Sequence, residues 1–185
     1  MSYLLPKSLV VNGIEHPIRY QYTAVLDIIS ALNDRELEDN EKVYIFLYIM
    51  YEDFEDIPEE DYAAALEEAT KFMDNGMESE KKDNVKKVDF EYDAPLLIPA
   101  INRVAGREIR LDPDIHWWTF LGWFMEIGEC TYSHVLNIRS KKASGKPLEK
   151  WETEFYTENK RLIDIPVRLT EEEKEAERRL NELLR

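Results

Sequence analysis

The chain has 185 residues and a formal net charge of -15 at pH 7, which suits one domain, or one domain with an appendage, that can bury a sizeable core. Such an excess of carboxylates disfavours binding to nucleic acid or to an anionic membrane, because phosphate contact needs clustered Lys and Arg. Cys130 is the only cysteine, so no disulfide can form within the chain and a reducing cytoplasm is the expected compartment.

The N-terminal residues predict a small β-hairpin. Asn12-Gly13 lies between residues 9–11 and residues 14–20, and this dipeptide is a strong hairpin signal because both residues tolerate positive φ. Pro17 in the return strand indicates a sheet edge. A two-stranded hairpin is only marginally stable by itself, so we expect it to pack on helices.

Apolar residues then recur at helical spacing in three segments, near residues 23–34, 38–51 and 58–73. The second segment contains the most apolar run of the chain, residues 43–51 (VYIFLYIMY). Nine residues are too few to span a membrane, which takes about 20. No secretory signal pattern is present at the N-terminus, so the sequence favours a soluble cytoplasmic protein.

A polar, charged stretch at about residues 74–89 contains almost no core residues. Composition of this kind is typical of a mobile linker. We expect it to separate an acidic N-terminal part from an aromatic C-terminal part within one mostly helical domain, residues 1–165.

The C-terminal part predicts a helix over residues 93–106, kinked or delayed by Pro99, and shorter helices over residues 131–138 and 147–162. Between them lies HWWTFLGWFMEI, residues 116–127, which Asp112-Pro113 would open. Apolar residues occupy every side of this helix, so we expect it to be buried all round. The predicted structural core comprises Trp117, Phe120, Leu121, Phe124, Trp151 and Phe155.

Residues 166–185 predict a separate, charged C-terminal helix that begins with a capping box, Thr170 with Glu173. Its apolar stripe is too narrow for a helix in the core and too regular for a disordered tail. The helix could therefore dock on this chain, on another copy or on a partner helix. The predicted partner-binding residues are Leu180, Leu183 and Leu184 of this helix and Tyr44, Tyr48 and Tyr51 of the second helix.

Residues that could carry catalysis or bind metal are few. His116 follows Asp112 and Asp114 with metal-like spacing, but two Asp at a helix start are ordinary capping residues and no second ligand cluster is present. Cys130 and His134 could lie one helical turn apart as nucleophile and base, yet a lone cysteine is more often a packed apolar residue. We expect no enzyme, no metal and no cofactor.

Charge is distributed unevenly. Residues 34–61 hold twelve Asp or Glu against two Lys or Arg, and residues 139–150 hold five Lys or Arg against one Glu. The acidic segment predicts a solvated face, or alternatively a docking surface or a mimic of nucleic-acid charge. The basic segment could meet the acidic face of another copy in head-to-tail association.

Three stretches together resemble one phage family. They are FEYDAPLLIPAINRVAG (residues 90–106), LDPDIHWWTFLGWFMEI (residues 111–127) and VLNIRSKKASGKPLEKWETEFYTENK (residues 135–160). In order, spacing and aromatic placement they are similar to the gene-product-fifteen proteins of Gram-positive siphophages and prophages, which are tail-assembly chaperones.

The resemblance implies a non-enzymatic assembly factor that keeps the long tape-measure protein soluble, gives way to the major tail protein and is absent from the mature virion. It also implies self-association in the cytoplasm of the bacterial host. The alternatives are a head–tail connector or tail-completion protein of the virion, an acidic DNA mimic that inhibits a nuclease, and an unrecognised hydrolase.

Overall fold

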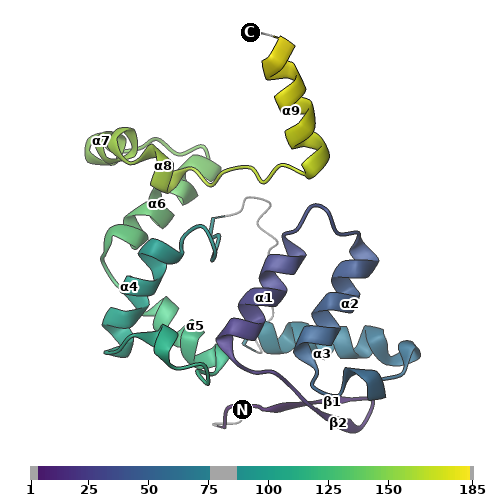
Figure 1. Cartoon of the computed structure of the whole chain (residues 1–185). Helices are drawn as coiled ribbons and strands as arrows, with labels where there is room; N and C mark the ends of the chain where they lie inside the picture. The colour runs from purple at the N-terminus through teal and green to yellow at the C-terminus, as the bar shows by residue number, and fades with distance from the viewer. Residues whose placement is uncertain (1–3, 76–86, 184–185) are drawn as a thin grey trace.

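Helices make up most of the chain in a computed structural model that describes residues 4–75 and 87–183 (Figure 1). The predicted mainly α fold, with an N-terminal hairpin and a charged C-terminal helix, is confirmed. The elements are β1 (Ser8–Val11), β2 (Ile14–Pro17), α1 (Tyr22–Leu32), α2 (Asp39–Met50), η1 (Phe54–Asp56), η2 (Glu59–Asp61), α3 (Tyr62–Met73), α4 (Ala94–Ala105), η3 (Ile109–Leu111), α5 (Trp117–Met125), α6 (Thr131–Ala143), α7 (Lys150–Glu158), α8 (Lys160–Ile163) and α9 (Glu171–Leu183).

The hairpin forms where the sequence predicts it. β1 and β2 pair antiparallel, and Asn12 and Gly13 between them have φ of 47° and 90°, as a two-residue turn of this kind requires. β2 ends at Pro17, three residues before the predicted end. The following residues pair elsewhere, because Ile18 forms a β-bridge with Tyr51.

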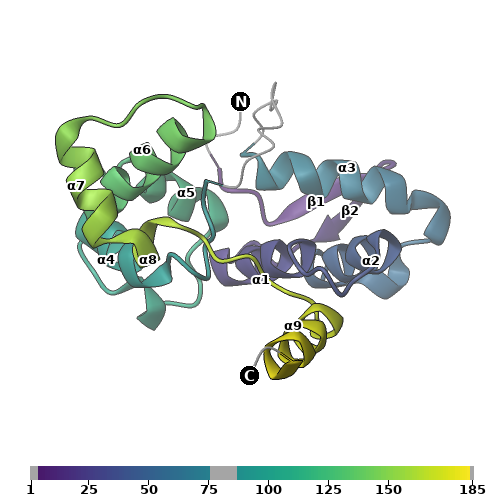
Figure 2. The ribbon, with the colours of Figure 1, turned by 90° about the horizontal axis from the view of Figure 1, so that it is seen from above.

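Two halves pack side by side. The N-terminal half contains the hairpin and α1 to α3, the C-terminal half contains α4 to α8, and α1 lies between α2 and the C-terminal half (Figures 1 and 2). The chain between β2 and α1 joins them through its backbone. Arg19 N–H donates to Met50 at 2.8 Å, and the Tyr20 carbonyl accepts from Trp117 N–H at 2.8 Å.

Two of the three tryptophans of α5 form hydrogen bonds with the C-terminal end of α3. The indole N–H groups of Trp117 and Trp118 donate to the carbonyls of Met73 and Phe72, each at 2.8 Å. These carbonyls belong to the last turn of α3, where a carbonyl has no donor four residues further along the helix; the Phe72 carbonyl also accepts from Asn75 N–H at 3.1 Å. Phe120, fully buried, stacks on Tyr22 of α1 with ring centroids 4.8 Å apart. α5 therefore joins the two halves.

The prediction that α5 is buried all round is wrong. Trp117 and Phe120 are buried, Leu121 and Phe124 are half-buried, and Met125 is exposed. The helix is only nine residues long and neighbouring helices cover one side of it, so its far side faces solvent. Its cap also differs from the prediction, because His116 rather than Asp112 precedes the first helical residue.

Helix limits in the C-terminal half differ from the predictions in three places. α4 begins at Ala94 and runs through Pro99 without a delayed start. α6 continues to Ala143, five residues beyond the predicted end at 138. The predicted helix over residues 147–162 is divided at Asn159, whose backbone leaves the helical region and whose side-chain amide donates to the Phe155 carbonyl at 3.0 Å, a local bond that competes with helix continuation.

α9 stands away from the two halves, with its N-terminal end nearest to them (Figure 1). Its predicted capping box is confirmed, since Thr170 Oγ1 accepts from Glu173 N–H and a Glu173 carboxylate oxygen accepts from Thr170 N–H. Within residues 4–75 and 87–183, no helix has the length and apolar character needed to cross a membrane.

Candidate functional site

A buried ion pair fixes the start of α4. Arg139 of α6 and Asp93 form two hydrogen bonds, of 2.7 Å and 2.8 Å, and both side chains are almost fully buried. The remaining guanidinium donors reach the carbonyls of Lys87, Leu162 and Ile163. All five N–H donors of this arginine thus have acceptors, and three separate chain segments meet at one side chain.

Asp93 accepts two further hydrogen bonds. They come from the Tyr132 hydroxyl at 3.1 Å and from the backbone N–H of Asp89 at 3.0 Å. Burial, reinforced by the neighbouring Asp93 carboxylate, raises the pKa of Tyr132 above its usual value, so this hydroxyl remains a donor at ordinary pH. The turn that contains residues 89–93 is therefore held in one conformation by a fully satisfied network.

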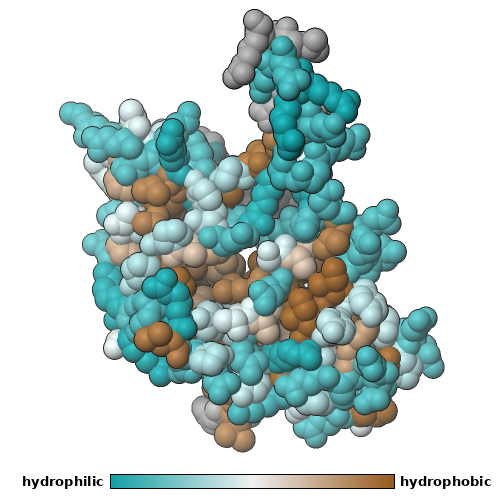
Figure 3. Space-filling model, in the orientation of Figure 1, coloured by the Kyte–Doolittle hydropathy of each residue, from teal (hydrophilic) through white to brown (hydrophobic). Residues whose placement is uncertain are grey.

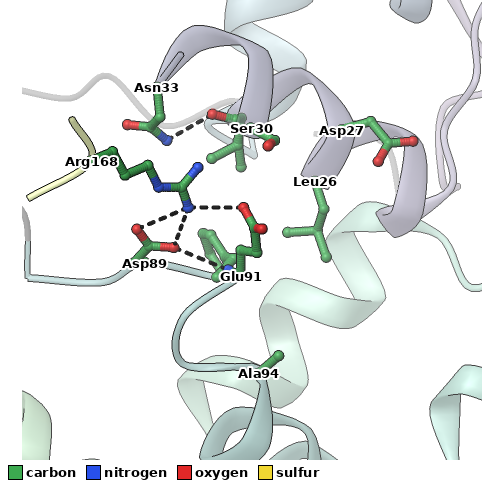
Figure 4. A pocket seen from close by; sticks show the side chains of 10 residues that line it. Leu26, Asp27, Ser30, Asn33, Asp89, Glu91, Ala94 and Arg168 are labelled. Carbon is green, nitrogen blue, oxygen red and sulfur yellow. Dashed lines mark hydrogen bonds and ion pairs between the residues drawn. The ribbon is translucent and has the colours of Figure 1, made fainter. Parts of the chain in front are cut away.

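A second arginine binds the outer side of the same turn. Nη2 of Arg168 lies 3.1 Å from Asp89 Oδ1 and 2.8 Å from Glu91 Oε2 (Figure 4). Asp89 is nearly buried, Glu91 is mostly exposed, and Arg168 is about one-third exposed. Unlike Arg139, this arginine comes from residues 164–170, the segment that leads to α9; we call this segment the strap.

A cleft of about 440 Å³ opens between α1 and the start of α4, with Arg168 at its rim (Figure 4). A neighbouring cavity of about 550 Å³ shares Ser30 and Arg168 with it. Apolar side chains from both halves line the cleft, and carboxylates surround them; in the space-filling view, apolar surface is visible between the halves (Figure 3). The lining residues are Leu26, Asp27, Ile29, Ser30, Asn33, Asp89, Phe90, Glu91, Ala94 and Arg168.

Polar contacts hold the base of α9 beside this cleft. Arg35 binds the Glu173 carboxylate through two bonds of 2.7 Å and 3.0 Å and also donates to the Arg168 carbonyl at 2.9 Å. The N–H of Glu171 donates to Glu36 at 2.6 Å. These contacts are exposed, and the anchor residues lie in the strap or the first turn of the helix.

The predicted partner-binding tyrosines divide into two groups. Tyr44 and Tyr48 are exposed by 53% and 56%, and their parallel rings pack edge-on against Phe54. The prediction that Tyr51 binds a partner at the surface is wrong. Tyr51 is fully buried, and its hydroxyl donates to the Ala65 carbonyl at 2.8 Å. The reason is that Tyr51 follows the last turn of α2 and points into the N-terminal half.

The predicted contact residues of α9 are only partly described. Leu180 is 56% exposed, and Ala176 one turn before it is also exposed. The side chain of Leu183 and the whole of Leu184 lie outside the described residues. Most of the predicted linker, residues 76–86, lies outside them too, whereas Asp89 at its predicted end is buried in the turn that Arg139 and Arg168 bind.

Two predicted core residues of α7 lie near the surface. Trp151 is 44% exposed, which corrects its assignment to the core, and Phe155 is half-buried. The buried residue of α7 is instead Glu152, which accepts hydrogen bonds from Asn137 and Lys141. Trp151 rests on the ring of His134, with centroids 5.3 Å apart, and this surface contact takes the place of a core position.

The histidine and cysteine that were considered as catalytic or metal-binding candidates form hydrogen bonds within the fold. His116 accepts the Trp118 N–H on Nδ1 at 3.0 Å and donates from Nε2 to the Pro6 carbonyl at 2.8 Å, and burial lowers the pKa of His116. Asp112 pairs with Arg107. Cys130 caps α6, because its sulfur accepts from Ser133 N–H.

The lysines of the basic segment are also bound within the chain. Lys141 donates to Glu152 at 2.6 Å and Lys142 to Asp164 at 2.5 Å. With Arg139 buried against Asp93, three of the five positive charges of this segment already have internal partners. The predicted use of this segment as a docking patch for an acidic face is weakened accordingly.

The cleft itself was not predicted. Asp89 fell in the predicted linker, and Arg168 fell in the predicted C-terminal segment, residues 166–185, ahead of its capping box. The available signal was the alternating carboxylates of DFEYD, residues 89–93, since three acidic side chains in five residues need nearby cations if they are buried. Nothing in the sequence shows which cations these are.

Comparison with protein families gives one match, to the family described as Bacteriophage Gp15 protein, over residues 1–165. The chain belongs to this family. The resemblance drawn from the aromatic stretches is thereby confirmed at the level of a Gp15 phage protein. Comparisons with curated proteins and with solved structures give no match.

The Gp15 match divides the site. The carboxylates of the turn, Asp89, Glu91 and Asp93, and their partner Arg139 lie within the matched residues. Arg168 and α9 lie beyond residue 165, outside the match. In this Gp15 protein, the cleft thus belongs to the family part of the chain, and the arginine at its rim comes from the residues that follow.

Proposed function

We propose that this Gp15-family protein is a non-enzymatic tail-assembly chaperone that binds the tape-measure protein in the cytoplasm of the infected bacterium and keeps it soluble. In this role it self-associates along its client, gives way to the major tail protein and is absent from the mature virion. The observation that carries the proposal is the exposed apolar surface, the Tyr44–Tyr48 pair on α2, on a phage protein of net charge -15.

An exposed apolar patch on a highly charged body is what a chaperone of an apolar helical client requires. The patch binds the client by removing apolar surface from water. The like charge on each bound copy then prevents the complexes from associating further. Aromatic side chains suit such a patch because they contribute large contact area with few rotatable bonds.

The proposal is tested by co-expression of the chain with the tape-measure protein of the same phage. We expect the wild-type chain to bring the tape-measure protein into the soluble fraction and to co-purify with it. A Tyr44→Ser/Tyr48→Ser variant should recover at least roughly tenfold less client, which corresponds to about 1.4 kcal/mol of binding free energy.

A matched control removes equally exposed apolar side chains elsewhere. Val10 and Ile14 of the hairpin are exposed by 56% and 59%, so a Val10→Thr/Ile14→Thr variant should recover client as the wild type does. Equal losses of client in both variants would show that the client binds exposed apolar surface nonspecifically. Detection of the chain at fixed copy number in purified virions by mass spectrometry would replace the chaperone role with a structural one.

A further inference from the structure

The cleft between the halves has the composition of a peptide-binding site. Leu26, Ile29 and Phe90 offer apolar surface, while Asp89 and Glu91 place carboxylates at one side. Its volume of about 440 Å³ lies in the range of ligand sites but accommodates only a few side chains. An occupant would therefore insert an arginine together with adjacent aliphatic groups.

The chain itself supplies an occupant of this chemistry. The strap has the sequence DIPVRLT, in which Arg168 lies between Val167 and Leu169. It crosses from α8 to α9 without regular secondary structure, and its arginine binds two of the three carboxylates of the cleft, those of Asp89 and Glu91. Arg168 is about one-third exposed and Glu91 is mostly exposed, so the pair between them contributes only a modest net free energy.

The two arginines of the turn differ in how they can be replaced. Arg139 is buried and binds three carbonyls as well as Asp93, so no incoming group can take its place. Arg168 approaches from outside through a single nitrogen, Nη2, so a partner's guanidinium could make the same or better contacts from solvent. Bidentate pairing is available to such a partner.

We propose that the cleft is a docking site for an arginine flanked by aliphatic side chains on the client protein, and that Arg168 occupies it until the client displaces the strap. The inference rests on the proposed chaperone function for the identity of the client. Displacement would free the strap, so client binding and the position of α9 would be coupled.

The test uses the full-length chain and a fluorescent peptide with the strap sequence, IDIPVRLTEE, followed by anisotropy. The Arg168→Gln variant should bind this peptide at least roughly tenfold more tightly than the wild type, because the internal competitor is weakened. A matched peptide with Gln in place of Arg should show no such gain. The Arg168→Gln/Glu91→Gln variant should lose this gain in affinity, because one of the carboxylates that bind the peptide's arginine is removed. Glu91 is largely exposed, so this change leaves the buried network intact.

Equal affinity of the wild type and Arg168→Gln, or equal binding of the two peptides, would overturn the docking site. The client's identity is tested separately by recovery of the tape-measure protein, which should rise for Arg168→Gln and fall for Arg168→Gln/Glu91→Gln. If the wild type recovers the client but neither variant alters recovery, the chaperone function stands and the client is not the occupant. If Arg168→Gln instead changes the oligomeric state in sedimentation, the occupant is the strap of a second copy.

Discussion

Arg139 and Arg168 bind the same short turn, residues 89–93, with different consequences. Arg139 is buried, uses every donor and joins α6, the turn and the end of α8. Arg168 is partly exposed, uses one nitrogen and joins the turn only to the strap. We therefore expect the first arginine to be needed for the fold and the second to be replaceable without unfolding.

The difference follows from solvation. A buried charge that loses its partner keeps the full cost of its desolvation. The Glu91 carboxylate is exposed and recovers hydration when it separates from Arg168, so that pair contributes little. The buried Asp89 carboxylate keeps the hydrogen bonds from the N–H groups of Glu91 and Tyr92, which limit the cost of losing Arg168. Position in the fold rather than residue type therefore decides which arginine is structural.

The largest expected effect is at Arg139. Arg139→Met should lower the free energy of unfolding by on the order of 3–5 kcal/mol, because the Asp93 carboxylate is left buried without its cation. Urea denaturation followed by tryptophan fluorescence measures this. Arg161→Met, at an exposed position, is the control and should hardly change the free energy of unfolding. Equal losses for Arg139→Met and Arg161→Met would mean that burial does not decide the contribution of an arginine.

Tyr132 tests how much the rest of the network contributes. Tyr132→Phe removes the hydroxyl that donates to Asp93 and should cost about 1–3 kcal/mol of unfolding free energy, since a buried charged acceptor loses one donor. Tyr92→Phe serves as the control, because the Tyr92 hydroxyl binds the exposed carbonyl of Arg161. A neutral Tyr132→Phe would show that Arg139 and the Asp89 N–H satisfy Asp93 without the hydroxyl.

Arg168 should have little effect on global stability. Arg168→Gln should lower the free energy of unfolding by about 1 kcal/mol, because Glu91 is exposed and the buried Asp89 carboxylate keeps its two backbone N–H donors. Raising NaCl to 1 M, where the Debye length is about 3 Å, should loosen the strap in the wild type without altering the Arg139 network. Hydrogen exchange of the strap and α9 amides measures the local opening, and a loss of stability comparable to that of Arg139→Met would contradict the distinction.

Lowering the pH should weaken the contacts that hold the first turn of α9, with an effect on stability smaller than that of Arg168→Gln. The Thr170 N–H and, next, Arg35 hold the pKa of Glu173 below its usual value. The contribution of Glu173 is therefore present above the pKa of the unfolded chain, about 4.3, and is lost as pH falls through its lower folded value. The Thr170 amide resonance in NMR should follow this titration in the wild type and lose it in Glu173→Gln, whereas Glu172→Gln should titrate as the wild type does.

The hairpin, the three N-terminal helices and the capping box of α9 could be predicted because each depends on neighbouring residues. Asn12-Gly13 sets the turn, and Thr170 with Glu173 sets the start of α9. Tyr51 and Trp151 were misplaced because apolar character alone does not tell which side of a short helix is covered. His116 was unexpected as a cap, since imidazole rarely has this role.

The sequence by itself determined the mainly helical class, the strongly acidic surface and the family. These are sums over many residues and tolerate errors at single positions. Only the tertiary structure decided which arginine binds which carboxylate, because Asp93 and Arg139 are 46 residues apart and Asp89 and Arg168 are 79 residues apart. Pairing over such separations depends on how the two halves pack, and charge alone would permit many other partners.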